Sequence, residues 1–93
     1  MNIYDLNNII NGKIININKK EYSNIQTDTR KVDRNSLLFI FKFEHDNAYK
    51  YIKNMKKIPA IIVINDDEEN IFNMSCIKVK NTIIAYSLLA SYY

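Results

Sequence analysis

The residues best suited to do chemistry lie in one short polar stretch, "QTDTRKV", at positions 26–32. Its centre places two hydroxyls, a carboxylate and a guanidinium in consecutive positions, at Thr27, Asp28, Thr29 and Arg30. Hydroxyls donate hydrogen bonds to phosphate or ring-carbonyl oxygens, and an arginine supplies a fixed, planar cation. The stretch therefore has two interpretations. Either it binds an anionic ligand, or it is an ordinary turn in which Asp28 bonds nearby backbone N–H groups and pairs with Arg30.

A second polar stretch, "FEHDN" at positions 43–47, follows a continuous apolar run and precedes a helical pattern. Its candidate binding residues are Glu44, His45, Asp46 and Asn47. The N-terminus of a helix presents free N–H groups and a positive dipole end, which suits an anionic or polar ligand. In open α/β sheets, ligands gather beyond the carboxyl ends of the strands. We therefore expect both polar stretches to lie on one edge of a sheet.

Other chemistries have less support in the sequence. His45 has no second histidine and no cysteine at ligand spacing, so we expect no metal site. Glu44 and Asp46 could act as an acid–base pair, but nothing places a substrate between them. Cys76, the one cysteine, is expected to be a buried apolar residue in a reducing compartment. Gly12 is the only glycine, which excludes a P-loop and a dinucleotide-binding fingerprint.

Composition indicates one soluble globular domain of 93 residues, with 47% apolar and 25% charged residues. The formal charge is +3, and the basic residues are scattered along the chain and interrupted by the acidic run at positions 66–69. We therefore expect no nucleic-acid partner, and a small RNA-binding protein is the weakest alternative. No apolar run approaches the ~20 residues of a membrane span, and the N-terminus lacks a signal-peptide layout. The sequence predicts a cytoplasmic protein without a membrane partner.

Periodicity predicts the elements that must position the two polar stretches. Ile3, Leu6, Ile9 and Ile10 mark a first helix, with Gly12 where its C-cap would lie. Strands are predicted at positions 13–17, 22–27, 37–41, 60–64 and 76–79, the segment 22–27 being the weakest. A second helix, with an apolar face formed by Ala48, Tyr51, Ile52 and Met55, is predicted to start at Asp46 or Asn47 and to end before Pro59.

The remaining segments complete the predicted fold. The acidic run is either the first turn of a short helix or a solvated loop. A last helix, capped by Asn81 or Thr82, should dock on the sheet through a stripe of Ile84, Ala85, Leu88, Leu89 and Tyr92. The segment 37–64 reads as a strand–helix–strand unit, which pairs its strands in parallel. The order of elements predicts an α/β fold, a small three-layer sandwich with a mostly parallel or mixed sheet and flanking helices.

Three segments together resemble a known family. "TDTRKV", "NSLLFIFKFEHDNAYKYI" and "IPAIIVI" are similar to the N-terminal domain of the Mur ligases, the ATP-dependent amide ligases of peptidoglycan precursor synthesis. The resemblance covers about residues 23–93. Within the family, the spacing up to Asp28 and the wording of the motif resemble the D-alanyl-D-alanine-adding members most, followed by those that add the third residue of the peptide.

The resemblance implies a substrate-recognition role. The family's N-terminal domain holds the UDP end of a UDP-N-acetylmuramoyl-peptide, while ATP and Mg²⁺ belong to the central domain, which is absent from this chain, as is the C-terminal domain. By position, Thr27 and Thr29 would face the uridine diphosphate, with Asp28 and Arg30 shaping that turn. The loop with Glu44, His45 and Asp46 would lie over the uracil and diphosphate. No catalytic residue and no cofactor is expected within this chain itself.

The sequence also departs from the family pattern. The family's Pro-Gly is Arg34-Asn35 here, its glycine after the apolar strand is Phe43, and its Asp-Gly-His is residues 47–49, "NAY". Loss of these glycines restricts close approach of the backbone to a ligand. The alternative hypothesis is therefore a degenerate Mur-like module that does not bind UDP and acts as a structural or protein-interaction domain.

Overall fold

A computed structural model describes residues 1–41, 48–53, 55–71 and 73–93. In chain order the elements are α1 (Ile3–Ile10), β1 (Lys13–Asn16), β2 (Asn24–Gln26), the 3₁₀ helix η1 (Thr29–Lys31), β3 (Ser36–Phe39), α2 (Ala48–Lys53), β4 (Ile61–Asn65), β5 (Ser75–Val79) and α3 (Thr82–Tyr92). The predicted order of helices and strands is confirmed. The predicted caps of α2, Asp46 and Asn47, lie outside the described residues.

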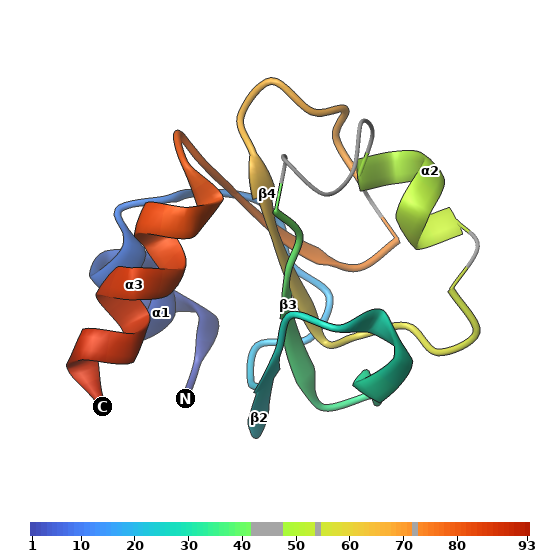
Figure 1. Ribbon diagram of the computed structural model, residues 1–93, viewed down its shortest axis with the longest axis horizontal. Helices are drawn as coiled ribbons and strands as arrows, with labels where there is room; N and C mark the ends of the chain where they lie inside the picture. Colours follow the sequence, from blue (N-terminus) through green and yellow to red (C-terminus); the bar gives the residue numbers. More distant parts are fainter. Residues whose placement is uncertain (42–47, 54, 72) are drawn as a thin grey trace.

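The five strands form one mixed sheet in the order β1-β5-β4-β3-β2. β2, β3, β4 and β5 run parallel to one another, and β1 pairs antiparallel with β5 at one edge. The predicted strand–helix–strand unit is thus β3–α2–β4, with Leu37 opposite Ile61. Helices α1 and α3 cover one face of the sheet, and α2 lies on the other (Figure 1). The predicted α/β sandwich is confirmed.

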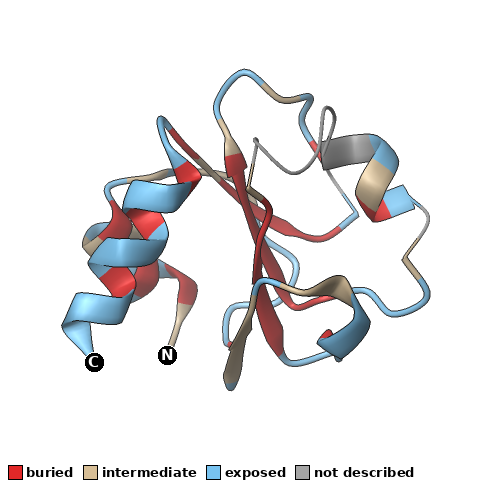
Figure 2. Ribbon diagram, viewed as in Figure 1, coloured by how far each residue is buried: buried red, intermediate tan, exposed pale blue. Residues whose placement is uncertain are grey.

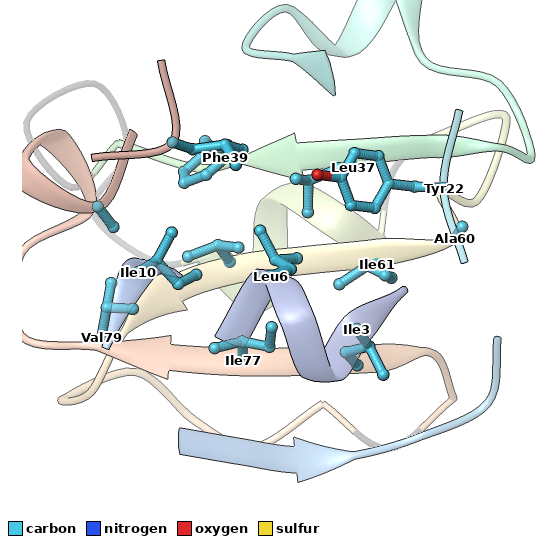
Figure 3. Packing of buried hydrophobic residues seen from close by; sticks show 13 residues of the cluster. Ile3, Leu6, Ile10, Tyr22, Leu37, Phe39, Ala60, Ile61, Ile77 and Val79 are labelled. Carbon is cyan, nitrogen blue, oxygen red and sulfur yellow. The ribbon is translucent and has the colours of Figure 1, made fainter. Parts of the chain in front are cut away.

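The sheet separates two hydrophobic clusters because successive side chains of a strand point to opposite faces. Leu37, Phe39 and Ile61 pack beneath α1 and α3, whereas Leu38 and Ile62 join the cluster on the side of α2. Both faces are covered, so β3 and β4 are buried along nearly their whole length (Figure 2). Figure 3 shows Ile3, Leu6 and Ile10 of α1 lying over the side chains of the central strands. This double burial explains the continuous apolar runs in the sequence.

The acidic run forms a loop and not a helix. The residues after β4 make a turn, in which the Glu68 N–H donates to the Asn65 carbonyl at 3.1 Å. The Asp66 N–H donates to the Val79 carbonyl at 2.8 Å, which ties the turn to the end of β5. The solvated-loop interpretation is therefore confirmed for the acidic residues 66–69, which are exposed or half-buried. The helical interpretation is wrong because these residues form a single turn, whose first N–H group bonds across to β5.

The end of α1 depends on two residues with different roles. The left-handed position is Asn11, with φ of 54°, and not Gly12 as the C-cap prediction suggested. Gly12 is needed for space. A Cβ there would overlap the Ile77 side chain and lie 2.9 Å from the Asn7 Oδ1 and 3.2 Å from the Lys78 carbonyl.

Substituting Gly12→Ala should therefore destabilise the fold by about 1–3 kcal/mol, the usual cost of forcing an extra carbon into a packed site. Urea denaturation measures this change. The neighbouring substitution Asn11→Gly is the control, since glycine adopts the left-handed conformation freely and should cost little. Equal midpoints for Gly12→Ala and the wild type would show that the contact is not real.

Helix α3 differs from its predicted docking. Asn81 caps it as expected, accepting hydrogen bonds from the N–H groups of Ile83 and Ile84 at 2.9 and 3.1 Å. Of the predicted stripe, Ala85 and Leu89 are buried. Ile84, Leu88 and Tyr92 are instead 59%, 39% and 61% exposed, and we call these three residues the α3 outer face.

The physical reason is that α3 has no charged residue, so apolar positions occur all around it and the sequence does not single out one buried face. The packing of α3 on α1 and β4 determines which of its faces is buried, and that face carries Thr82, Ala85 and Leu89. Most of α3 therefore remains exposed (Figure 2).

Candidate functional site

The turn after β2 is held by its own side chains. Asp28 caps η1, its Oδ1 accepting from the backbone N–H of Arg30 at 3.0 Å. The same carboxylate accepts two bonds from the guanidinium, from Nε at 3.1 Å and from Nη2 at 2.9 Å. This is the geometry that the ordinary-turn interpretation predicts. It does not exclude a ligand, because the Arg30 side chain is 88% exposed and its Nη1 takes no part in these bonds.

The bonds from Arg30 lower the pKa of Asp28 from its ordinary value of 3.8 to about 2. The guanidinium contributes most, followed by the Arg30 backbone N–H. Because the pKa is lower in the folded protein, the contribution of this pair to stability is present above about pH 4 and is lost as the pH falls through about 2. The carboxylate is therefore ionised at neutral pH and keeps the turn in this shape.

Removing the guanidinium should reverse this shift. In Arg30→Gln, we expect the pKa of Asp28 to rise towards 3.8, while Lys31→Gln should change it far less because Lys31 makes only a minor contribution. Titration of the carboxyl carbon followed by NMR measures both values. A pKa that stays near 2 in Arg30→Gln would contradict the assignment of the shift to this ion pair.

Thr29 connects the turn to helix α2. Its Oγ1 lies 2.8 Å from the Tyr51 hydroxyl. This hydrogen bond joins η1 to α2, whose Tyr51 packs against the hydrophobic cluster on that face of the sheet. Val32, just after η1, is buried in that cluster with Ile52 of α2. Thr27, by contrast, is exposed at the end of β2. Of the two hydroxyls predicted to face a ligand, one is thus directed to a tyrosine and the other to solvent.

A hollow of about 490 Å³ lies between the turn and the end of α2. We call it the turn hollow, and its lining residues are Thr29, Arg30, Val32, Tyr51, Met55, Lys56 and Lys57. Among the described residues, the lining holds three cations and no carboxylate. Its volume is within the range of small-molecule sites, about 300–1,000 Å³. The turn hollow is therefore large enough for a nucleotide-sized anion and has the charge to attract one.

Five of these lining residues were not predicted as site residues, and three of the five are polar: Tyr51, Lys56 and Lys57. Tyr51 was placed on the buried face of α2, but it is half-buried and its hydroxyl reaches Thr29. Lys56 and Lys57 lie in the link between α2 and β4, where the sequence showed only a basic pair before Pro59. The basic pair was the available signal. That this pair lies beside the turn after β2 depends on the tertiary packing of α2, which the spacing of residues does not predict.

The second predicted loop, with Glu44, His45, Asp46 and Asn47, lies outside the described residues. The structure does show that the strands before both loops are neighbours, with Gln26 of β2 opposite Leu38 of β3 in parallel register. Whether the loops share one hollow stays a prediction. Within the described ranges no group of three or more histidine, cysteine, aspartate or glutamate residues could hold a metal ion.

Two further properties concern the chain as a whole. Cys76 is buried in the cluster beneath α2, and burial raises its pKa to about 11, in keeping with the predicted structural role. None of the helices that the structure describes has the length and apolar character needed to cross a bilayer.

Comparison with known proteins places these features in context. No family model matches the chain. Over 84 residues, 90% of its length, the chain is 31% identical to the UDP-N-acetylmuramoyl-tripeptide–D-alanyl-D-alanine ligase of Haemophilus influenzae. Over 90 residues, 92% of its length, it is 30% identical to the UDP-N-acetylmuramoyl-L-alanyl-D-glutamate–2,6-diaminopimelate ligase of Clostridium tetani.

In both cases the matched region is 18% of the relative, so the chain spans less than a fifth of the length of these ligases. Both relatives are Mur ligases, the family that the "TDTRKV" segment resembles. They add different groups and match this chain about equally well. The comparisons therefore support the Mur ligase family for this chain, without selecting between its D-alanyl-D-alanine-adding and diaminopimelate-adding types.

Proposed function

We propose that this chain is the substrate-recognition domain of a peptidoglycan-precursor amide ligase and binds the UDP end of a UDP-N-acetylmuramoyl-peptide. The observation that carries the proposal is the turn hollow, where Thr29 and Arg30 of the family-like motif meet Lys56 and Lys57 in a space of about 490 Å³. The names of the two relatives supply the substrate class. Within that class we favour the D-alanyl-D-alanine-adding type.

The domain's contribution to the ligase would be orientation. A cationic hollow that binds the diphosphate would hold the UDP end of the substrate, which lies far from the reacting carboxylate. Binding energy from this remote part can then position the carboxylate that reacts. The chain would not catalyse amide formation alone. ATP, Mg²⁺ and the residues that activate the carboxylate belong to the central domain of the resembled ligases, which is the expected partner within a longer cytoplasmic enzyme.

The charge at the turn supports the choice of a diphosphate. Arg30 keeps part of its guanidinium exposed while Asp28 fixes its direction, so the cation is already oriented before a ligand arrives. Such a planar donor matches phosphate oxygens. Thr27 adds an exposed hydroxyl beside it. Pre-orientation reduces the entropy lost when the ligand binds.

Chemical-shift mapping with UDP-N-acetylmuramoyl-tripeptide tests this proposal. We expect saturable amide shifts at Thr27–Arg30, at Tyr51, at Lys56–Lys57 and in the loop 44–47. UDP alone should shift the same residues, since the nucleotide end is the part that binds. An absence of shifts at about 1 mM ligand, which corresponds to a binding free energy weaker than about −4 kcal/mol, would overturn the proposal.

A second candidate function is supported by a different surface. The α3 outer face, formed by Ile84, Leu88 and Tyr92, exposes apolar side chains on a helix without charges. Contiguous apolar surface of this kind often marks a protein interface. The degenerate-module hypothesis would use this face and not the turn hollow. Self-association or partner binding that Leu88→Lys abolishes, together with no UDP-dependent shifts, would favour it.

A further inference from the structure

A second hollow lies at the edge of the sheet where the parallel strands β2 to β5 begin, and it shares Lys56 and Lys57 with the turn hollow. Its volume is about 860 Å³. Four segments line it: residues 18–19, which follow β1, and residues 33–35, 56–60 and 73–74, which lead into β3, β4 and β5. We call it the amino-end hollow.

The lining of the amino-end hollow is strongly basic. Lys19, Arg34, Lys56 and Lys57 face it with one carboxylate, Asp33, which gives a formal charge of +3, equal to that of the entire chain. The fold thus brings together four of the thirteen basic residues, which are scattered in the sequence. A concave surface lined by one sign of charge focuses its field and raises the local concentration of the opposite ion.

The single carboxylate is already occupied. Asp33 Oδ1 accepts from the Asn35 N–H at 2.8 Å, and the Asn24 side-chain amide donates to the same carboxylate at 3.2 Å. The Ser36 hydroxyl lies 3.2 Å from the same Oδ1. These bonds keep the Asp33 pKa below its ordinary value, so it stays ionised as a structural acceptor within its own turn. It therefore offsets the four cations only in part.

Buried serines fix the walls of the hollow. Ser36, Ser75 and Thr82 are the buried polar residues in the described part of the chain, and the two serines begin β3 and β5. Ser75 Oγ accepts from the Asn18 N–H at 2.8 Å and donates to the Lys19 carbonyl. Ser36 Oγ accepts from the Asp33 N–H at 2.9 Å. Lys19 in turn donates from Nζ to the Arg34 carbonyl at 3.0 Å, which links the two walls.

From this geometry we propose that the amino-end hollow is a second anion site that binds a small phosphorylated ligand carrying at least two phosphate charges. The ligand class follows from the lining. Lysines act as point-charge donors to phosphate, and the amides of Asn18, Asn35 and Asn73 supply neutral polar groups beside them. The volume, within about 300–1,000 Å³, suits a small molecule. Lys56 and Lys57 also line the turn hollow, so Lys19 and Arg34 are the cations that belong to the amino-end hollow alone and distinguish the two sites.

Pyrophosphate is the probe that tests this site, with backbone amide shifts as the readout. We expect saturable shifts at residues 18–19, 33–35, 56–57 and 73. The double variant Lys19→Gln/Arg34→Gln should weaken binding by at least about tenfold, because it removes two charged donors. These residues line the amino-end hollow and not the turn hollow. Arg30→Gln, which alters only the turn hollow, should leave these shifts unchanged.

A matched control removes the same charge elsewhere. Lys13→Gln/Lys80→Gln also lowers the net charge by two, but these residues lie at the start of β1 and after β5, away from this hollow. Binding should change by less than about twofold, since exposed charges at that separation are screened by salt. Three results would overturn the proposal: no saturable shifts at about 10 mM pyrophosphate, equal weakening in both double variants, or tighter binding of a hexaglutamate peptide at the same residues.

Discussion

Replacing Phe39 with alanine should destabilise the protein by about 3–5 kcal/mol, the range measured for removal of a buried aromatic side chain. Phe39 is 1% exposed and belongs to the cluster shared by β3, β4, α1 and α3. Its ring also meets Tyr86 of α3 edge to face, with centroids 5.3 Å apart and an interplanar angle of 80°. The substitution leaves a cavity and removes an aromatic contact that holds α3 on the sheet.

Phe41 provides a matched control for this result. It also packs edge to face on Tyr86, at 5.8 Å, but it is only partly buried at the margin of the same cluster. Phe41→Ala should therefore cost clearly less than Phe39→Ala in the same chemical denaturation experiment. Since a small domain has a total stability of only about 5–15 kcal/mol, the Phe39 variant should also unfold at a much lower temperature. A larger loss for Phe41→Ala would contradict the assigned core.

The second large effect is expected on ligand binding. Arg30→Gln should weaken the affinity for UDP-N-acetylmuramoyl-tripeptide by roughly 10- to 100-fold, because a charged hydrogen bond to phosphate contributes about 1.5–3 kcal/mol. Isothermal titration calorimetry measures the change. Stability should hardly respond, since the ion pair with Asp28 is exposed and such pairs contribute little. The two readouts therefore separate a role in binding from a role in folding.

Lys31→Gln is the control for Arg30→Gln. The two residues are neighbours on η1, both exposed, and each substitution removes one positive charge. Only Arg30 lines the turn hollow. We expect the Lys31 variant to bind nearly as well as the wild type, apart from a small effect of net charge at low salt. Equal losses in both variants would mean that Arg30 acts through general electrostatics and not through contact with the ligand.

The fold could be predicted from the sequence because the strongest signals are local and consistent. The apolar runs at positions 37–41 and 60–64 indicated strands buried on both faces, and β3 and β4 occupy the centre of the sheet. Asn81 signalled the start of α3 through its side-chain cap. Each of these features depends on a few neighbouring residues, whose backbone preference and pattern of burial favour the same structure.

The incorrect predictions share a physical cause, which is tertiary packing. Helix α3 is apolar on every side, so only its contacts with α1 and β4 could show that Leu89 is buried and Leu88 is not. At the end of α1 the left-handed residue is Asn11, whereas Gly12 is needed for space beside Ile77 of β5. Neither constraint has a local signature in the sequence.

Of the motif Thr27–Arg30, the structure places Thr29 and Arg30 in the lining of the turn hollow, and their binding role stays a prediction. The motif Thr27–Arg30 was recognised from its residue types, and its two interpretations are not exclusive, because the pairing of Asp28 with Arg30 also orients the exposed guanidinium. Tyr51, Lys56 and Lys57 were missed because they enter the turn hollow from a segment more than twenty positions later in the sequence. The sequence likewise did not predict the cluster formed by Lys19, Arg34, Lys56 and Lys57, because the strand order brings these residues together.

An experimental structure of the chain with UDP-N-acetylmuramoyl-tripeptide bound is the measurement that tests the proposed recognition role most directly. We predict that the diphosphate lies in the turn hollow within hydrogen-bonding distance of Arg30, with Thr29 and His45 on two sides of the same ligand. A ligand seated elsewhere, or Thr29 and His45 on opposite sides of the molecule with no shared cleft, would contradict the proposal.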